Sequence, residues 1–175
     1  MNVKQAIQNS RSVRAYRNTS VDSNLVMELI DAARLAPSGN NAQPWRYKIV
    51  DDAITKARLK EGQVFMQPFV YTAPVLIFCC ADPDSYPKSK FVSGIDDPYE
   101  FRALRDLSIS SQNLVLRATE LGLGTCYIGW MNKPKAKEIL DIPDRFVLPY
   151  AITVGYSTRE IKPRPRKSLH EIILP

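Results

Sequence analysis

Histidine is almost absent from this sequence, in which His170 is the only one among 175 residues. A Ser–His or Cys–His catalytic pair needs a histidine beside its nucleophile, and many catalytic metal sites use several histidines. The sequence therefore argues against both kinds of site. Any chemistry that the protein performs must come largely from a bound cofactor.

Cysteines are few, and no long apolar run is present. Cys79, Cys80 and Cys126 are odd in number and form no CxxC motif, so buried thiols in a reducing compartment are the favoured interpretation. The longest apolar run, residues 74–81, is too short to cross a bilayer, and the N-terminus has no apolar signal region. We therefore expect a cytoplasmic protein without a membrane partner.

The composition is that of an ordinary globular protein, with 45% hydrophobic and 24% charged residues. A chain of 175 residues is long enough to bury a sizeable core. It contains no internal repeat, linker or composition shift that would mark a second domain. We expect residues 1–175 to form a single domain.

The net charge of +6 is concentrated in two segments at opposite ends of the chain. Arg11, Arg14 and Arg17 form the first, and residues 162–167 (KPRPRK) form the second. Guanidinium groups bind phosphate oxygens in pairs, although either segment alone is equally well explained as a solvated basic turn. No helix-turn-helix, zinc-finger or RNA-binding signature accompanies them, so a small phosphorylated ligand is favoured over nucleic acid.

Hydrophobic periodicity predicts alternating helices and strands. Apolar side chains at helical spacing predict helices over about 3–9, 22–36, 52–60, 98–121 and 134–140, and strand patterns cover 45–50, 74–81 and 148–155. The polar segment 82–97 is predicted to be a lid, a substrate-binding element or a mobile loop. Asp97 is predicted to cap the helix that follows. Leu169, Ile172 and Ile173 are expected to anchor the C-terminus by packing.

The stretch Ala36–Trp45 (APSGNNAQPW) joins a helix to a strand and carries no charge. Pro37 stops the incoming helix, and Gly39 and the two asparagines after it tolerate positive φ. Such a loop holds many short hydrogen-bonding groups at fixed positions. It suits a planar polar heterocycle better than a phosphate or a metal, the alternative being an ordinary polar loop.

Four motifs in a fixed order together resemble the nitroreductase family of flavin enzymes. Each alone is weak, but the ordered set is specific and spans nearly the whole chain. The motifs are Arg11-Ser12-x-Arg14, Ala36-Pro37-Ser38-x-x-Asn41-x-Gln43-Pro44-Trp45, Gly122-Leu123-Gly124-Thr125-x-x-Ile128-Gly129, and Gly155-Tyr156 followed by Arg164-Pro165-Arg166.

The resemblance implies an α+β fold with a central, mostly antiparallel sheet flanked by helices, and an intertwined homodimer with two FMN sites at its interface. By family position, the FMN phosphate and ribityl chain are held by Arg11, Ser12, Arg14, Arg164 and Arg166. The partner subunit lines the isoalloxazine with Pro37, Ser38, Gly39, Asn41 and Gln43. The other side of the ring is covered by Tyr127, Ile128 and Gly129.

The sequence departs from the family pattern in two places. Many members carry an acidic residue where this chain has Ile128. The Asn and Lys that often contact the flavin pyrimidine are not evident, and we assign Gln63, with Gln67 as its alternative, to that role. A hydrogen-bonding group there stabilises reduced flavin, so this difference bears on the redox potential.

The predicted activity is ping-pong hydride transfer from NADH or NADPH, through FMN, to a nitroaromatic, quinone or similar electron-poor acceptor. No side chain needs to act as acid or base, which agrees with the scarcity of histidine. The alternatives within the superfamily are metabolite dehydrogenation, dehalogenation and flavin destruction. Outside it stand a non-enzymatic flavin-binding module and a nucleic-acid-binding module. The sequence does not choose the acceptor or the nicotinamide donor.

Overall fold

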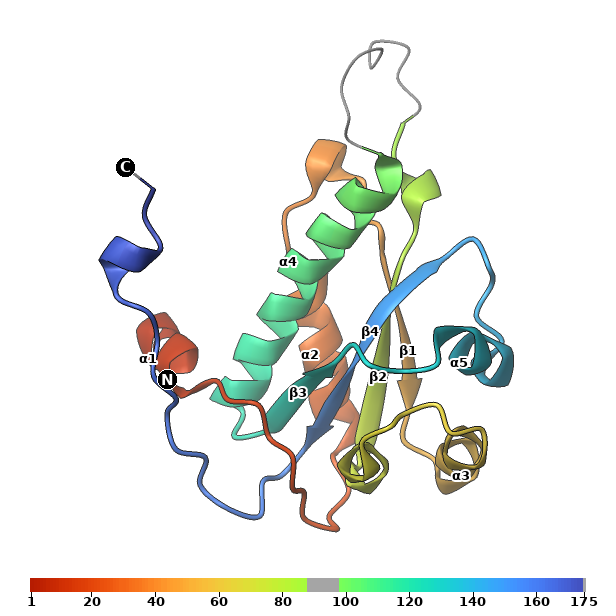
Figure 1. The fold of residues 1–175 in the computed structure, drawn as a ribbon, viewed down its shortest axis with the longest axis horizontal. Helices are drawn as coiled ribbons and strands as arrows, with labels where there is room; N and C mark the ends of the chain where they lie inside the picture. The colour runs from red at the N-terminus through yellow and green to blue at the C-terminus, as the bar shows by residue number, and fades with distance from the viewer. Residues whose placement is uncertain (88–97, 175) are drawn as a thin grey trace.

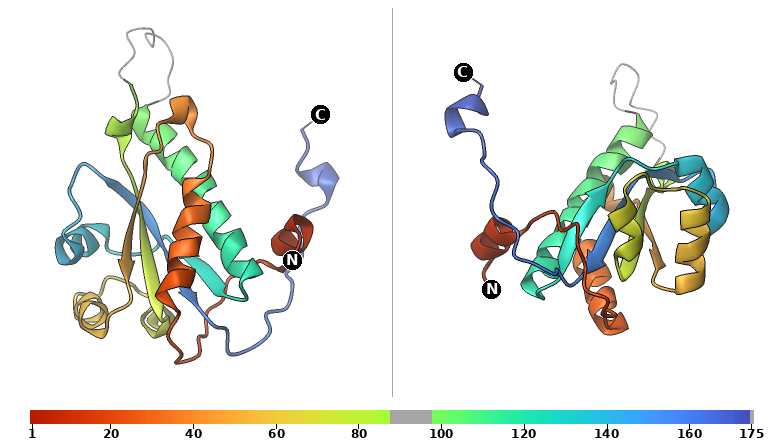
Figure 2. Two further views of the ribbon diagram at one scale, coloured as in Figure 1. Left: turned by 180° about the vertical axis from the view of Figure 1, so that it is seen from behind. Right: turned by 60° about the horizontal axis from the view of Figure 1, so that its bottom comes forward.

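The computed structural model describes residues 1–87 and 98–174. Asp97 and most of the 82–97 segment lie outside these ranges. A sheet stands between two pairs of helices: α2 and α4 cover one face, and α3 and α5 cover the other (Figures 1 and 2). The two faces carry separate cores, because alternate residues of each strand point to opposite sides.

The sheet has four strands in the order β1-β2-β4-β3, and every neighbouring pair is antiparallel. The strands are β1 (Trp45–Val50), β2 (Val75–Ala81), β3 (Gly124–Ile128) and β4 (Val147–Gly155). Strand β2 is central and buried on both faces, as its continuous apolar run predicted. The expected α+β fold with an antiparallel sheet is confirmed, and the homodimer stays a prediction.

The described residues form the α-helices α1 (Val3–Asn9), α2 (Ser23–Arg34), α3 (Ala53–Glu61), α4 (Tyr99–Glu120) and α5 (Lys133–Leu140). Before four of these helices, the capping side chain accepts a hydrogen bond from a backbone N–H group of the first turn. Asp22 accepts from Asn24 at 2.8 Å and Asp52 from Thr55 at 2.7 Å. Free N–H groups at a helix start need such partners, which explains why these helices begin where they do.

Both ends of the chain lie on the same side of the molecule (Figure 1). The segment after α1 runs along β3 and β4: Ser12 bridges Thr125, and Val13 N donates to the Thr125 carbonyl at 2.8 Å. The Tyr16 hydroxyl is buried, 2.6 Å from Thr153 Oγ1, and donates to the Val13 carbonyl at 2.9 Å. These contacts fix the N-terminal basic segment against the sheet.

After β4 the chain leaves the body as an arm, residues 156–174, which passes α1 and ends beyond it (Figures 1 and 2). The prediction that apolar side chains anchor this end by packing is wrong for the single chain. Leu169, Ile172 and Ile173 are 70%, 62% and 65% exposed. An apolar cluster of this kind marks a surface that another chain covers in many proteins.

Candidate functional site

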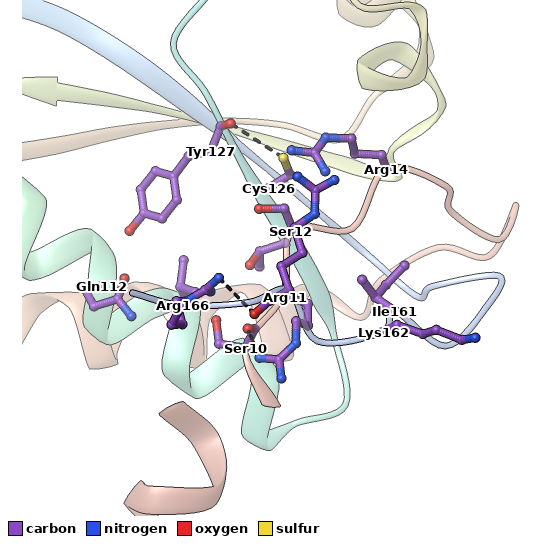
Figure 3. A pocket seen from close by; sticks show the side chains of 13 residues that line it. Ser10, Arg11, Ser12, Arg14, Gln112, Cys126, Tyr127, Ile161, Lys162 and Arg166 are labelled. Carbon is purple, nitrogen blue, oxygen red and sulfur yellow. Dashed lines mark hydrogen bonds between the residues drawn. The ribbon is translucent and has the colours of Figure 1, made fainter. Parts of the chain in front are cut away.

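A cavity of about 350 Å³ opens where the two ends of the chain meet β3 and α4 (Figure 3). Its walls come from four parts of the sequence: the segment after α1, the middle of α4, strand β3 and the C-terminal arm. The lining residues are Ser10, Arg11, Ser12, Arg14, Gln112, Val115, Thr125, Cys126, Tyr127, Ile161, Lys162, Arg164 and Arg166.

Cations dominate the cavity. Arg11 and Arg14 come from one end of the sequence and Arg164 and Arg166 from the other, and Lys162 is a fifth. Within residues 1–87 and 98–174, no carboxylate forms a salt bridge with any of them. Unneutralised guanidinium groups around a cavity attract an anion and present paired donors to it.

Ser12 places a hydroxyl among these guanidinium groups. Its backbone bridge to Thr125 of β3 sets its position. Figure 3 shows Ser12 next to Arg11 and Cys126, on the side of the cavity away from Gln112. Two arginines and a hydroxyl on one short segment, facing two arginines on the arm, suit the oxygens of a phosphate monoester.

The other end of the cavity is aromatic. Tyr127 of β3 is 40% exposed and packs edge-on against Tyr150, with ring centres 5.2 Å apart. Desolvation raises the pKa of the Tyr127 phenol far above its ordinary value, so the group stays neutral at physiological pH. Tyr127 therefore offers a flat apolar surface rather than an acid or base.

Cys126 is the one thiol that lines the cavity among the described residues. Burial raises the pKa of this thiol, and the opposing effect of Arg14 is smaller. A protonated thiol is a poor nucleophile. No group of three His, Cys, Asp or Glu side chains that could hold a metal occurs in the described part of the chain. The cavity is thus built to bind rather than to react through its own side chains.

One side chain outside the cavity lining has an unmet hydrogen bond. Gln67 Oε1 is the only buried side-chain nitrogen or oxygen without a partner among the described residues. Gln67 stands two residues after Phe65, which forms an antiparallel bridge with Met131, the second residue after Gly129. A buried carbonyl oxygen without a donor is costly unless a ligand supplies one.

The 37–43 loop does not line this cavity. Gly39 N donates to Asp106 Oδ2 at 2.8 Å, near the start of α4, whereas Gln112 and Val115 line the cavity further along the same helix. At about 1.5 Å per residue, six helical residues separate the two places by roughly 9 Å along the axis. A single chain therefore keeps Pro37, Ser38, Gly39, Asn41 and Gln43 apart from the basic cavity.

Three other predicted site residues also lie outside the cavity lining. Gln63 is exposed after the end of α3, with φ of 49°. Ile128 is buried in the core under α3 and α5, and Gly129 follows it. Sequence reasoning did not assign Ser10, Gln112, Lys162 or Cys126 to the site. Of these four residues, only Lys162 stood out in the sequence, as part of the basic segment 162–167.

The nitroreductase family model matches residues 7–156, most of the chain. A nitroreductase family protein from Clostridium difficile superimposes with a TM-score of 0.85, at 26% identity, covering 99% of this chain and 98% of that one. The nitroreductase fold is therefore established. This chain belongs to the nitroreductase family.

Two relatives are named for different activities. The chain is 31% identical over 173 residues to a Cr(VI) reductase from Pseudomonas sp., covering 93% of this chain and 70% of the relative. It is 28% identical over 197 residues to an NADH dehydrogenase from Thermus thermophilus, covering 99% and 96%.

A protein from Exiguobacterium sibiricum, solved in complex with FMN, has a TM-score of 0.89 at 20% identity and covers 99% and 96%. At that identity the likeness shows the fold alone. Among the described helices, none has the length and apolar content needed to span a membrane.

Proposed function

We propose that the protein is a single-domain, FMN-dependent NAD(P)H oxidoreductase that reduces electron-poor small molecules and works as a homodimer. The observation that carries the proposal is the basic cavity that both ends of the chain build together. It is supported by relatives named for NADH oxidation, for Cr(VI) reduction and, in Bacillus subtilis, as an FMN reductase (NADPH). The three buried, unpaired cysteines suit a reducing compartment such as the cytoplasm.

The residues present fit FMN in three respects. Four arginines and Ser12 match a phosphate at one end of the cavity, and Tyr127 offers an apolar surface at the other. Gln67, outside the cavity lining, has a buried oxygen that needs an N–H donor, which a flavin pyrimidine has. In the proposal, the cations hold the phosphate, Tyr127 lies along the ligand and Gln67 accepts from the ring.

Bound FMN would supply the hydride chemistry between a reduced nicotinamide and the acceptor. The chain's part is to hold and orient. Arg11, Arg14, Arg164 and Arg166 would bind the phosphate, and Ser12 would donate or accept a hydrogen bond beside it. Ile128 and Gly129 would bring backbone close to the ring. No side chain in the cavity needs to move a proton, in line with the neutral Tyr127 and Cys126.

The homodimer completes the site in this proposal. The 37–43 loop is displaced from its own chain's cavity, so its Pro37, Ser38, Gly39, Asn41 and Gln43 would line the flavin of the second copy. The exposed Leu169 and Ile172 at the end of the arm give a second reason to expect a covering partner. Nitroaromatics, quinones and chromate are the acceptors to test first.

The deciding experiment is an absorption spectrum with added FMN, followed anaerobically after NADH and then NADPH. We expect tight binding of FMN at one per chain, bleaching by at least one donor, and recovery of colour with an acceptor. Bound flavin that neither donor bleaches would point to another flavin reaction. A protein that fails to bind FMN would refute the proposal.

A substitution at Gln67 separates ligand binding from folding. Because Gln67 Oε1 has no hydrogen bond to lose, Gln67→Leu should leave the free energy of unfolding of the FMN-free protein unchanged or slightly raised. FMN binding should weaken by about tenfold through the lost contact to the ring. Thermal unfolding and fluorescence titration measure the two effects. Unchanged FMN affinity would remove Gln67 from the site.

A further inference from the structure

The loop that would serve the second copy is held in an unusual backbone conformation. Asn40, Asn41 and Gln43 have φ of 54°, 54° and 48°, in the left-handed region. This region is strained for residues other than glycine. Inside the loop, Gln43 N donates to Ser38 Oγ at 3.0 Å. Strain of this kind persists only where surrounding groups hold the backbone in place.

A buried carboxylate supplies one such hold. Asp106 is 2% exposed, and its Oδ2 accepts from Gly39 N at 2.8 Å and from the Tyr86 hydroxyl at 2.7 Å. Its Oδ1 accepts from Arg105 Nε at 3.1 Å. One side chain of α4 thus ties together three segments that are distant in sequence.

Asp106 stays ionised in its buried position. Burial alone would raise the pKa of this carboxyl, but hydrogen bonds from Tyr86, Gly39 and Arg105 outweigh burial and hold the pKa below its ordinary value. The carboxylate therefore remains an acceptor for both Gly39 and Tyr86 at physiological pH.

The other end of the loop is held separately. Arg46 Nη1 donates to the Gln43 carbonyl at 2.9 Å, and Asp82 N donates to the Pro44 carbonyl at 2.8 Å. Removing Asp106 would therefore release the Gly39 end while β1 and its connection to β2 stay in place. This makes the Gly39 end testable on its own.

We infer that Asp106 is a positioning residue for the flavin site of the second copy. It fixes Gly39 and so pre-organises the strained 38–43 loop, although it touches neither flavin nor substrate. This inference rests on the proposed function. Its physical reason is that a loop already ordered loses less conformational entropy when a ligand binds.

Four single variants test the inference through FMN affinity. Asp106→Ala leaves Gly39 N and the Tyr86 hydroxyl without their acceptor and should weaken FMN binding at least about tenfold. Asp106→Asn should retain most of the affinity, because one amide oxygen can still accept from both donors. Tyr86→Phe removes a single hydrogen bond and should lie in between. Asp31→Ala removes an exposed carboxylate of α2 and should bind FMN like wild type.

The order of the FMN affinities of these variants tests the role of Asp106. Wild-type affinity in Asp106→Ala, or equal losses in the Asn and Ala variants, would overturn the inference. If Asp106→Ala does not fold, Tyr86→Phe alone still tests it: a folded variant, judged by its thermal midpoint, that binds FMN as tightly as wild type would be the negative result.

Mixed dimers show on which subunit Asp106 acts. We would co-express an Asp106→Ala chain with an Arg164→Ala/Arg166→Ala chain under different affinity tags and purify the mixed dimer. If the loop serves the other copy, both defects fall on one site and the second site is intact. One FMN per mixed dimer should then bind with wild-type affinity. If the loop serves its own chain, each site has a defect, no site has wild-type affinity, and the inference fails.

The wild-type protein keeps this result distinct from failure of the proposed function. A wild-type chain that binds no FMN, or stays monomeric by light scattering, refutes the proposed function and the inference with it. A wild-type dimer that binds FMN while Asp106→Ala matches it refutes the inference alone.

Discussion

Replacing Arg164 and Arg166 together by alanine is expected to abolish retention of FMN. The two side chains are the arm's guanidinium groups in the basic cavity, and within the described residues neither has a carboxylate partner that would be left unpaired. Each charged hydrogen bond contributes about 1.5–3 kcal/mol, so losing two should weaken binding by at least about a hundredfold. Fluorescence titration with FMN measures the loss, and the affinity of wild type should also fall with salt.

The matched control is Arg58→Ala/Arg145→Ala. It removes the same charge from α3 and from the chain between α5 and β4, and neither residue lines the basic cavity. That variant should bind FMN within about twofold of wild type. Equal losses in the two double variants would mean that overall charge, not the arm, governs binding. Tight binding by the Arg164→Ala/Arg166→Ala protein would show that the phosphate lies elsewhere.

The second large effect is expected for Gly124→Ala. A Cβ added at Gly124 would lie 2.5 Å from Val13 Cγ2 and 2.9 Å from Val13 Cβ. Val13 sits between Ser12 and Arg14, so relieving the clash pushes the N-terminal basic segment off β3. Overpacking of this kind costs about 1–3 kcal/mol, or roughly 3–10 °C in the thermal midpoint. FMN affinity should fall as well, because Ser12 and Arg14 move.

Gly129→Ala is the control for stability. Its Cβ would meet no atom within 4 Å, so the FMN-free protein should unfold within about 2 °C of wild type. A large loss of stability in this variant, or none in Gly124→Ala, would contradict the packing described for β3. Any fall in FMN affinity of a stable Gly129→Ala protein would further support a flavin ring close to this backbone.

Much of the fold was predictable because local pattern and burial agree. The run Val75–Ala81 is apolar throughout, and it became the central strand with both faces covered. Asp22 and Asp52 marked helix starts through their capping side chains. Strand β3 was not predicted, since its five residues have no alternating pattern and its place depends on pairing with β4 and with Ser12.

Site residues could be predicted from the sequence only where the residue type itself indicates what it binds. Arginines at both ends of the chain signalled an anion, and the structure places them around one cavity. Gln112 lines that cavity because of how α4 packs, which the sequence does not encode locally. The 37–43 loop was recognisable as a rigid polar loop, but its distance from the basic cavity is a property of the whole fold. That the basic cavity and the loop bind FMN stays a proposal.

The shared construction of the cavity sets a limit on when it can form. Arg11 and Arg14 are made first, and Arg164 and Arg166 are made at least 150 residues later. A growing chain that has not reached residue 164 lacks both of the arm's guanidinium groups at the cavity. If the cavity holds the FMN phosphate as proposed, cofactor loading has to wait for Arg164 and Arg166. A proteolytic cut in the arm before these residues would then release FMN while leaving the sheet and its helices folded.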